Sequence, residues 1–348
     1  MSLSSSVAPS AAPGPDQSGA SGSRRDPSGG GPELTLIVRA RRSLALDVVC
    51  FDLADPAGAP LPAWTAGAHV DVTVRPGLTR QYSLCGDPSD RGVWRIAVLR
   101  EAAGRGGSMH LHDRVGAGTT LTVSHPRNAF ALVEAPRYLL VAGGIGITPL
   151  MPMVADLAAR GADWSLLYGG RALAAMAFAE ELARYGPRVV LHPQDTHGLL
   201  PIGDVLGDLA GSGAHEGTAV YCCGPEGLLG AVEAACAAWP AGALHTERFR
   251  PAEPAVRDGD HPFELRLARS GRVLTVRPGQ SVLAALESAG AAVTSSCRDG
   301  TCGTCETAVL GGDVDHRDTV LSQAERAAGR TMMVCVSRSL GERLELDI

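Results

Sequence analysis

The chain contains no lysine, since all 31 of its basic residues are arginine. A Walker-type phosphate loop requires a lysine, and pyridoxal enzymes hold their cofactor on a lysine Schiff base. Both kinds of site, and any lysine nucleophile, are therefore excluded. Long apolar runs are also missing, because no stretch reaches the roughly 18 residues of a membrane-spanning helix. We therefore expect no membrane span.

Positive charge is scarce as well. The 31 basic residues are outnumbered by 37 acidic ones, for a formal net charge of −6, which gives no indication of nucleic-acid binding. Residues 1–32 lack the charged start and apolar core of a secretory signal, and their Ser, Ala, Gly and Pro content predicts a disordered tail. Nine cysteines, an odd number, argue against a disulfide framework and favour metal-binding thiols in a reducing cytoplasm.

Four of the cysteines share the spacing C-x4-C-x2-C…C, namely Cys297, Cys302, Cys305 and Cys335. This is the spacing by which plant-type ferredoxins hold a [2Fe–2S] cluster. Gly300 and Gly303 would let the loop curl around the cluster, with backbone N–H groups aimed at its sulfurs. A zinc site or disulfides are the alternatives, but structural zinc sites usually have two paired knuckles, and Cys335 stands alone. The remaining cysteines outside the motifs are expected to be small buried residues: Cys50, Cys85, Cys222 and Cys236.

Residues 33–132 contain short alternating apolar runs, for example at 34–38, 46–50 and 70–74, separated by Gly, Pro and Asp turns. This pattern predicts an antiparallel β-barrel that ends near Val123.

Two motifs in this region carry side chains suited to a flavin. The first consists of Arg80, Tyr82 and Ser83 on one strand, where a ring can cover an isoalloxazine face and the polar groups can serve a phosphate and a ring edge. The second precedes a short helix predicted at 109–114 and consists of Gly106, Gly107 and Ser108. Bare N–H groups and the helix dipole favour an anion there. The R-x-Y-S pattern resembles that of flavin-binding ferredoxin-reductase barrels.

Residues 133–250 alternate between predicted strands and helices, with a strand at 138–142 and helices at 148–160 and 174–185. This alternation predicts an α/β domain with a parallel sheet and a ligand at the carboxyl ends of its strands. Two motifs fall at such ends. The first contains Gly143, Gly144 and Gly146, with Thr148 as the expected helix cap. The second is Cys223-Gly224-Pro225. In the ferredoxin-reductase superfamily this pair of motifs marks the nicotinamide-nucleotide domain.

A Pro- and Gly-containing linker is predicted at 251–260. Residues 261–348 then predict a hairpin, a helix at 281–289, the cysteine loop and a strand at 331–337 that carries Cys335. The chain is therefore expected to have three domains: an antiparallel barrel, a parallel-sheet α/β domain and an α+β domain of the β-grasp ferredoxin type.

Taken together, residues 33–348 resemble the phthalate dioxygenase reductase family, with the vanillate O-demethylase reductases as the nearest group. The resemblance rests on five motifs in the family's order and implies FMN rather than FAD. It implies that the flavin is bound by Arg80, Tyr82, Ser83 and Arg105 to Ser108 and lined by Val98 and Thr148. Phe249 matches the phenylalanine of the family's E-x-F motif, which lies beside the flavin; a core residue at a domain seam is the alternative.

The resemblance also implies an activity. A hydride from NADH or NADPH would reduce FMN, and electrons would pass singly to the cluster and then to a separate terminal oxygenase of the Rieske type. No catalytic acid–base residue is expected. Exposed Arg298, Asp299 and Thr301 would contact the partner, and the chain itself is expected to be a monomer. Arg171 offers a partner for the 2′-phosphate of NADPH, but the family more often uses NADH, which we therefore expect.

Three other functions stay open at this point. The same module could donate electrons to a cytochrome P450, or it could reduce a small molecule such as a nitro compound or a ferric chelate. A zinc-binding interaction module without redox activity is the third. A visible spectrum would separate the last from the others, since flavin and [2Fe–2S] bands would be missing.

Overall fold

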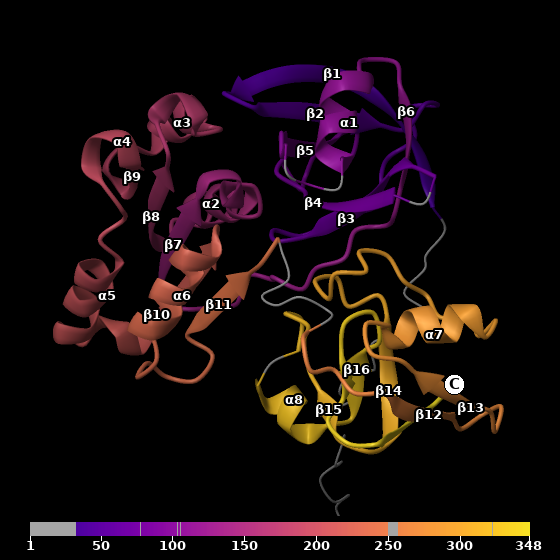
Figure 1. Ribbon diagram of the computed structural model, residues 1–348. Helices are drawn as coiled ribbons and strands as arrows, with labels where there is room; N and C mark the ends of the chain where they lie inside the picture. Colours follow the sequence, from indigo (N-terminus) through magenta and orange to yellow (C-terminus); the bar gives the residue numbers. More distant parts are fainter. Residues whose placement is uncertain (1–32, 77, 103, 105, 250–256, 322) are drawn as a thin grey trace, which may run out of the picture.

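The computed structural model describes residues 33–348, apart from 77, 103, 105, 250–256 and 322. The tail predicted at 1–32, Arg105 and most of the predicted linker lie outside the described residues. The chain forms three successive sheets, and Figure 1 shows each sheet with its own helices in a separate region of the molecule. Among the helices that the structure describes, none has the length and apolar character to cross a membrane.

The first sheet has six antiparallel strands in the order β4-β3-β6-β1-β2-β5. Its elements are β1 (Leu34–Ala45), β2 (Val48–Ala54), β3 (His69–Arg75), β4 (Leu78–Ser83), β5 (Trp94–Leu99), α1 (Gly107–Arg114) and β6 (Thr120–Val123). The two edge strands approach each other at an isolated bridge between Leu84 and Ile96. Alternate side chains of the strands, such as Val70 and Val72, fill the core. Leu46 breaks the predicted alternation and is exposed, because the chain reverses at Asp47 with a φ of 59°.

The second sheet has five parallel strands in the order β11-β10-β7-β8-β9. Its elements are β7 (Arg137–Gly143), α2 (Leu150–Ala159), β8 (Asp163–Gly170), α3 (Ala179–Leu182), β9 (Val189–Pro193), α4 (Gln194–His197), α5 (Ile202–Gly211), β10 (Thr218–Cys223), α6 (Glu226–Ala235) and β11 (Leu244–Glu247). The sheet has a hydrophobic cluster on each face, which confirms the predicted parallel α/β domain. The helix predicted at 174–185 is wrong: only the four residues of α3 are α-helical, between two 3-10 segments.

The third sheet is mixed, with the order β13-β12-β18-β14-β16 and a separate β15-β17 pair. Its elements are β12 (Phe263–Leu267), β13 (Val273–Val276), α7 (Val282–Ser288), β14 (Glu306–Gly311), β15 (Val314–Asp315), α8 (Gln323–Ala328), β16 (Thr331–Met333), β17 (Arg338–Ser339) and β18 (Arg343–Leu346). Ser281 caps α7 by accepting a hydrogen bond from the Ala284 N–H. The strand predicted at 331–337 is too long, because β16 ends at Met333 and Cys335 lies in the turn that follows.

A buried ion-pair network fixes the start of this third domain. Asp260 accepts hydrogen bonds from both terminal nitrogens of Arg317, at 3.1 and 2.6 Å, and its carboxylate lies 3.4 Å from Nε of Arg338. The Asp260 side chain is 5% exposed and that of Arg338 is 2% exposed. The hydrogen bonds from Arg317 lower the pKa of Asp260 to about 2. The resulting stabilisation is present above the unfolded-state pKa near 4 and is lost as the pH falls towards 2.

We expect Asp260→Asn to destabilise the third domain by about 3–5 kcal/mol, because two buried arginines would lose their shared carboxylate. The matched control is Asp347→Asn, which breaks an equally well-formed pair with Arg269 on the surface. An exposed pair contributes about 0–1 kcal/mol. Hydrogen exchange of the β12 and β18 amides in the full chain measures the difference. Equal protection in the two variants would contradict the importance of the buried network.

Candidate flavin and iron–sulfur site

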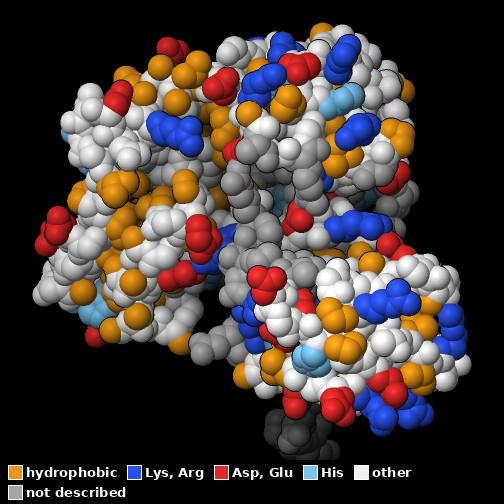
Figure 2. Space-filling model, viewed as in Figure 1, with side chains coloured by type: hydrophobic (Ala, Val, Ile, Leu, Met, Phe, Trp, Pro, Cys, Tyr) orange, Lys and Arg blue, Asp and Glu red, His pale blue; other side chains and the backbone are white. Residues whose placement is uncertain are grey.

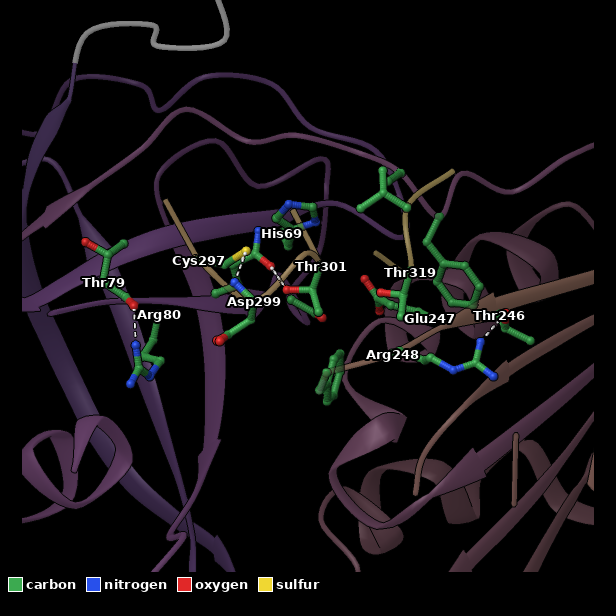
Figure 3. Close-up of a pocket in the computed structure, with 16 residues that line it drawn as sticks. His69, Thr79, Arg80, Thr246, Glu247, Arg248, Cys297, Asp299, Thr301 and Thr319 are labelled. Atoms are coloured by element: carbon green, nitrogen blue, oxygen red, sulfur yellow. Dashed lines mark hydrogen bonds between the residues drawn. The ribbon is translucent and has the colours of Figure 1, made fainter. Parts of the chain in front are cut away.

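A cavity of about 160 Å³ lies where the three domains meet. Its volume is below the roughly 300–1,000 Å³ of pockets that enclose a whole small molecule, so it accommodates part of a larger ligand. Figure 3 shows side chains from all three domains around it. The first domain contributes His69, Thr79, Arg80, Gln81, Ser83, Ala129 and Phe130. The second contributes Thr246 to Phe249, and the third contributes Cys297, Asp299, Thr301, Thr319 and Val320.

The two flavin motifs of the first domain lie against each other. A Cβ atom at Gly107 would lie 2.9 Å from Cγ and 3.2 Å from Nε of Arg80, so the arginine side chain crosses the start of α1. Gly106 is the N-cap of this helix, with a φ of 84° that favours glycine. The Ser108 hydroxyl is held by the Glu101 N–H, which donates to it at 3.0 Å. A guanidinium beside a helix N-terminus is an arrangement that binds a phosphate.

The two nucleotide motifs of the second domain are also in contact. A Cβ atom at Gly146 would lie 2.2 Å from the carbonyl oxygen of Cys223, and one at Gly143 would lie 2.6 Å from Cδ of Pro225. These glycines are therefore required for close packing of two backbones at the carboxyl ends of β7 and β10. The predicted cap is wrong: Thr148 is already helical, its hydroxyl donates to the Ile145 carbonyl, and Pro149 is the N-cap of α2.

The four motif cysteines converge in the third domain and all are buried. The Cys297 sulfur is in hydrogen-bonding contact with those of Cys302 and Cys335, and Cys335 is in contact with Cys305. The hydrogen bonds from the other two thiols lower the pKa of Cys297 far below its usual range. In the described part of the chain, no group of His, Cys, Asp and Glu side chains has the arrangement for a single metal ion. Four converging thiols at this spacing suit a two-iron cluster better than zinc.

The loop around these thiols has the features that a cluster requires. The Asp299 N–H donates to the Cys297 sulfur at 3.3 Å, and the Thr304 N–H donates to the Cys302 sulfur at 3.4 Å. Gly300 has a φ of 69°, and a Cβ atom there would lie 2.5 Å from Val336 Cγ2. The buried hydroxyl of Ser296 has no hydrogen-bond partner within the described residues. An unpaired buried hydroxyl beside converging thiols fits a bound group with further acceptor atoms at this position.

Buried polar atoms without partners also surround the cavity. Within the described residues these are Nε2 of His69, Nε2 of Gln81 and Oε2 of Glu247. Such atoms are costly to bury unpaired, so their presence fits a bound molecule with polar edges. Burial lowers the pKa of His69 to about 4, with a further lowering effect from Arg127. No sequence pattern predicted a role for these three side chains, because they meet only when the three domains come together.

Glu247, the last residue of β11, is joined to the first domain by a hydrogen bond from Ser83. The residue as a whole is partly exposed, but its Oε2 atom is buried. Burial raises the pKa of Glu247 to about 8. The carboxyl group is therefore largely protonated at neutral pH and can donate a hydrogen bond.

We expect Glu247→Gln to make the folding stability of the protein less dependent on pH. With a folded-state pKa above the unfolded value of 4.5, the stabilisation from the protonated group is complete below about pH 4.5 and is lost as the pH rises through 8. The melting temperature of the native chain should therefore fall relative to that of the variant between pH 5 and pH 9. Parallel melting curves across this range would show that Glu247 is ionised at neutral pH.

The structure places the other predicted residues at varying distances from the cavity. Phe249 lines it and is 44% exposed, so it is not a core residue. Tyr82 packs against the core of the first domain, while Val98 and Thr148 are buried away from the cavity wall. Asp299 and Thr301 line the cavity and therefore face the first domain, which differs from their expected role at a partner surface.

Comparison with known proteins agrees with this geometry. Residues 265–340 match the family of 2Fe-2S iron-sulfur cluster binding domains. The phenoxybenzoate dioxygenase subunit beta of Ectopseudomonas oleovorans is 46% identical over 316 residues, covering 90% of this chain and 97% of that protein. The phthalate dioxygenase reductase of Burkholderia cepacia is 39% identical over 321 residues, again covering 90% of this chain and 97% of that protein.

The chain belongs to the phthalate dioxygenase reductase family. The crystal structure of phthalate dioxygenase reductase, described as a modular structure for electron transfer from pyridine nucleotides to [2Fe–2S], has a TM-score of 0.68 and 38% identity over 91% of this chain and 98% of that one. This assignment confirms the predicted resemblance and the predicted oxidoreductase class. Like its relatives, the chain is a reductase of the kind that serves oxygenase systems.

A second solved structure matches an equal share of this chain within a longer protein. An intact type IV self-sufficient cytochrome P450 monooxygenase has a TM-score of 0.82 and 43% identity, covering 91% of this chain but 41% of that one. The present chain thus spans about two fifths of that protein.

Proposed function

We propose that the protein transfers electrons from NADH through FMN and a [2Fe–2S] cluster to a separate Rieske-type oxygenase. The observation that carries the proposal is the cavity at the junction of the three domains, which is lined at once by the flavin motif, the end of the nucleotide domain and Cys297. The cavity thus places the flavin motif beside a cluster cysteine and beside the last strand of the nucleotide domain, which supports this order of carriers. FMN, when bound, accepts two electrons as a hydride and gives them up singly.

Each domain contributes its own part to the transfer. Arg80 and the N–H groups at the start of α1 bind the FMN phosphate, and Tyr82 and Ser83 orient the ring. The Gly143–Gly146 segment and Cys223-Gly224-Pro225 bind the pyrophosphate of NADH, and Phe249 shields the flavin from water. The iron is held by Cys297, Cys302, Cys305 and Cys335. The domain limits that we propose are 33–132, 133–250 and 261–348, and the first sheet is proposed to close into a barrel.

Asp195, in the short helix α4 that follows β9, is the acidic residue that we propose for the ribose hydroxyls. The Asp195 N–H donates to the Arg171 carbonyl at 3.0 Å, just beyond the ends of β8 and β9. A carboxylate beside this turn binds ribose hydroxyls. Its position supports NADH as the donor, even though Arg171 is nearby. Nine thiols, all free and buried, suit a reducing compartment such as the cytoplasm.

A cytochrome P450 is the second candidate acceptor, because a closely similar module occurs within a self-sufficient P450. Stopped-flow spectroscopy of the purified, reconstituted protein separates the candidates. NADH should bleach the flavin bands first and the cluster bands second, and a Rieske protein should then reoxidise the cluster. Reoxidation by a P450 alone would favour the second candidate. A colourless protein without iron or acid-labile sulfide would disprove the proposal.

A further inference from the structure

One face of the β3-β4 ladder is polar and points towards the cluster-binding domain. His69 is paired with Ser83, and Asp71 is paired with Gln81. Directly opposed residues share one face of an antiparallel pair, and successive residues alternate between faces. The intervening Val70 is in the core, so these four side chains lie together on the other side.

The cluster loop lies against this polar face. The Thr301 hydroxyl donates to Oε1 of Gln81 at 3.3 Å, which joins the first and third domains directly. His69, Gln81 and Cys297 line the same cavity, and Figure 3 shows His69, Cys297 and Thr301 among the residues around it. In the view of Figure 2 the outward surface of the third domain carries charges of both signs. Because Cys297 lines the cavity, its thiol lies on the side of the cluster site that faces the flavin domain.

His69 is the unusual member of this face. It is 5% exposed, and its Nε2 atom has no hydrogen-bond partner among the described residues. Its backbone is fixed by a pair of hydrogen bonds with Arg127, at 2.8 and 3.0 Å. An imidazole carries at least one N–H in either protonation state, and a buried one needs an acceptor.

We infer that His69 positions and tunes the cluster from the flavin domain, by donating a hydrogen bond from Nε2 to a sulfur at the Cys297 edge. This inference rests on the proposed function. Hydrogen bonds to the sulfurs help set the potential of an iron–sulfur cluster, and a donor raises it because it offsets the charge gained on reduction. His69 thereby favours electron flow from the flavin to the cluster only when the third domain is docked.

The test compares His69→Leu and His69→Gln in the full chain with both cofactors bound. Loss of the donor should shift the equilibrium between flavin and cluster about tenfold towards the flavin, which is a cluster potential lower by ~59 mV. Glutamine keeps an N–H at a similar position and should restore most of the difference. Spectroelectrochemical titration follows the flavin and cluster bands separately. The control is His125→Leu, a partly buried histidine of the same domain.

The outcomes are distinct. A shifted flavin potential with an unchanged cluster would show that the imidazole contacts the flavin instead. Unchanged potentials with both cofactors bound would show that His69 has only a structural role. Each of these two results would overturn the inference. Pulsed EPR of the reduced native protein, labelled with ¹⁵N-histidine, gives an answer even if His69→Leu does not fold. We expect a weak coupling to an imidazole nitrogen, and its absence would also overturn the inference. Failure of the proposed function is recognised separately, since the native protein itself would then show no cluster signal.

Discussion

Cys302→Ser should lower electron transfer from NADH to a protein acceptor by at least about a hundredfold, or ~2.7 kcal/mol of barrier, while NADH still bleaches the flavin. Cys302 is buried and contacts Cys297, and the Thr304 N–H donates to its sulfur. Serine leaves only three thiolates in a loop that is shaped around four. The hydride step takes place between the first and second domains, where this residue makes no contribution.

The control for this variant is Cys236→Ser, at the end of α6. Cys236 is also buried, at 7% exposed, but it packs in the outer cluster of the second domain. Its replacement should leave both steps unchanged. Stopped-flow spectra recorded with and without the acceptor measure the two steps in each protein. Transfer to the acceptor at the native rate in Cys302→Ser would show that electrons do not pass through the cluster. Loss of flavin bleaching with FMN still bound would show that the order of carriers is wrong.

Those features of the fold that depend on local chemistry could be predicted from the sequence. Alternation along 70–74 predicted β3, because one side of a strand must face the core. The spacing of the cysteines predicted a loop that places Cys297 and Cys305 around a common centre, since sulfur ligands and positive φ angles occur at fixed offsets. The glycines of both nucleotide motifs were recognised for the same reason, as each is needed where two backbones pack closely.

The features that could not be predicted depend on contacts between distant segments. His69 belonged to no motif, and Glu247 was noted only as the first residue of the E-x-F motif, because both side chains reach the cavity only in the assembled three-domain structure. Asp195 lies far from Arg171 in the sequence but beside it in space, because β8 and β9 are neighbours in the parallel sheet. The strand through Cys335 was predicted too long. Residues 332–336 are all apolar and buried, which is typical of a strand, although residues 334–336 form the turn that carries the Cys335 thiol.

Gly146→Val should abolish nearly all reduction of the flavin by NADH. A Cβ atom at this position would lie 2.2 Å from the Cys223 carbonyl oxygen and 2.8 Å from the Gly224 nitrogen. Both are backbone atoms, so the glycine-rich segment must move away from the end of β10. We expect kcat/KM for NADH to fall about a hundredfold or more, which corresponds to ~2.7 kcal/mol. Chemical reduction with dithionite, which needs no nucleotide site, should still reduce both flavin and cluster.

The matched control is Gly203→Val on α5, where an added Cβ atom meets nothing within 4 Å. It introduces the same side chain in the same domain and should leave reduction by NADH close to the native rate. Native kcat/KM in Gly146→Val would place the nucleotide somewhere other than the ends of β7 and β10. If dithionite also failed to reduce the flavin in this variant, the damage would extend to the flavin itself. Because Glu247 lines the cavity and is paired with Cys223 at the end of β10, a displaced segment should affect hydride delivery before it affects flavin binding.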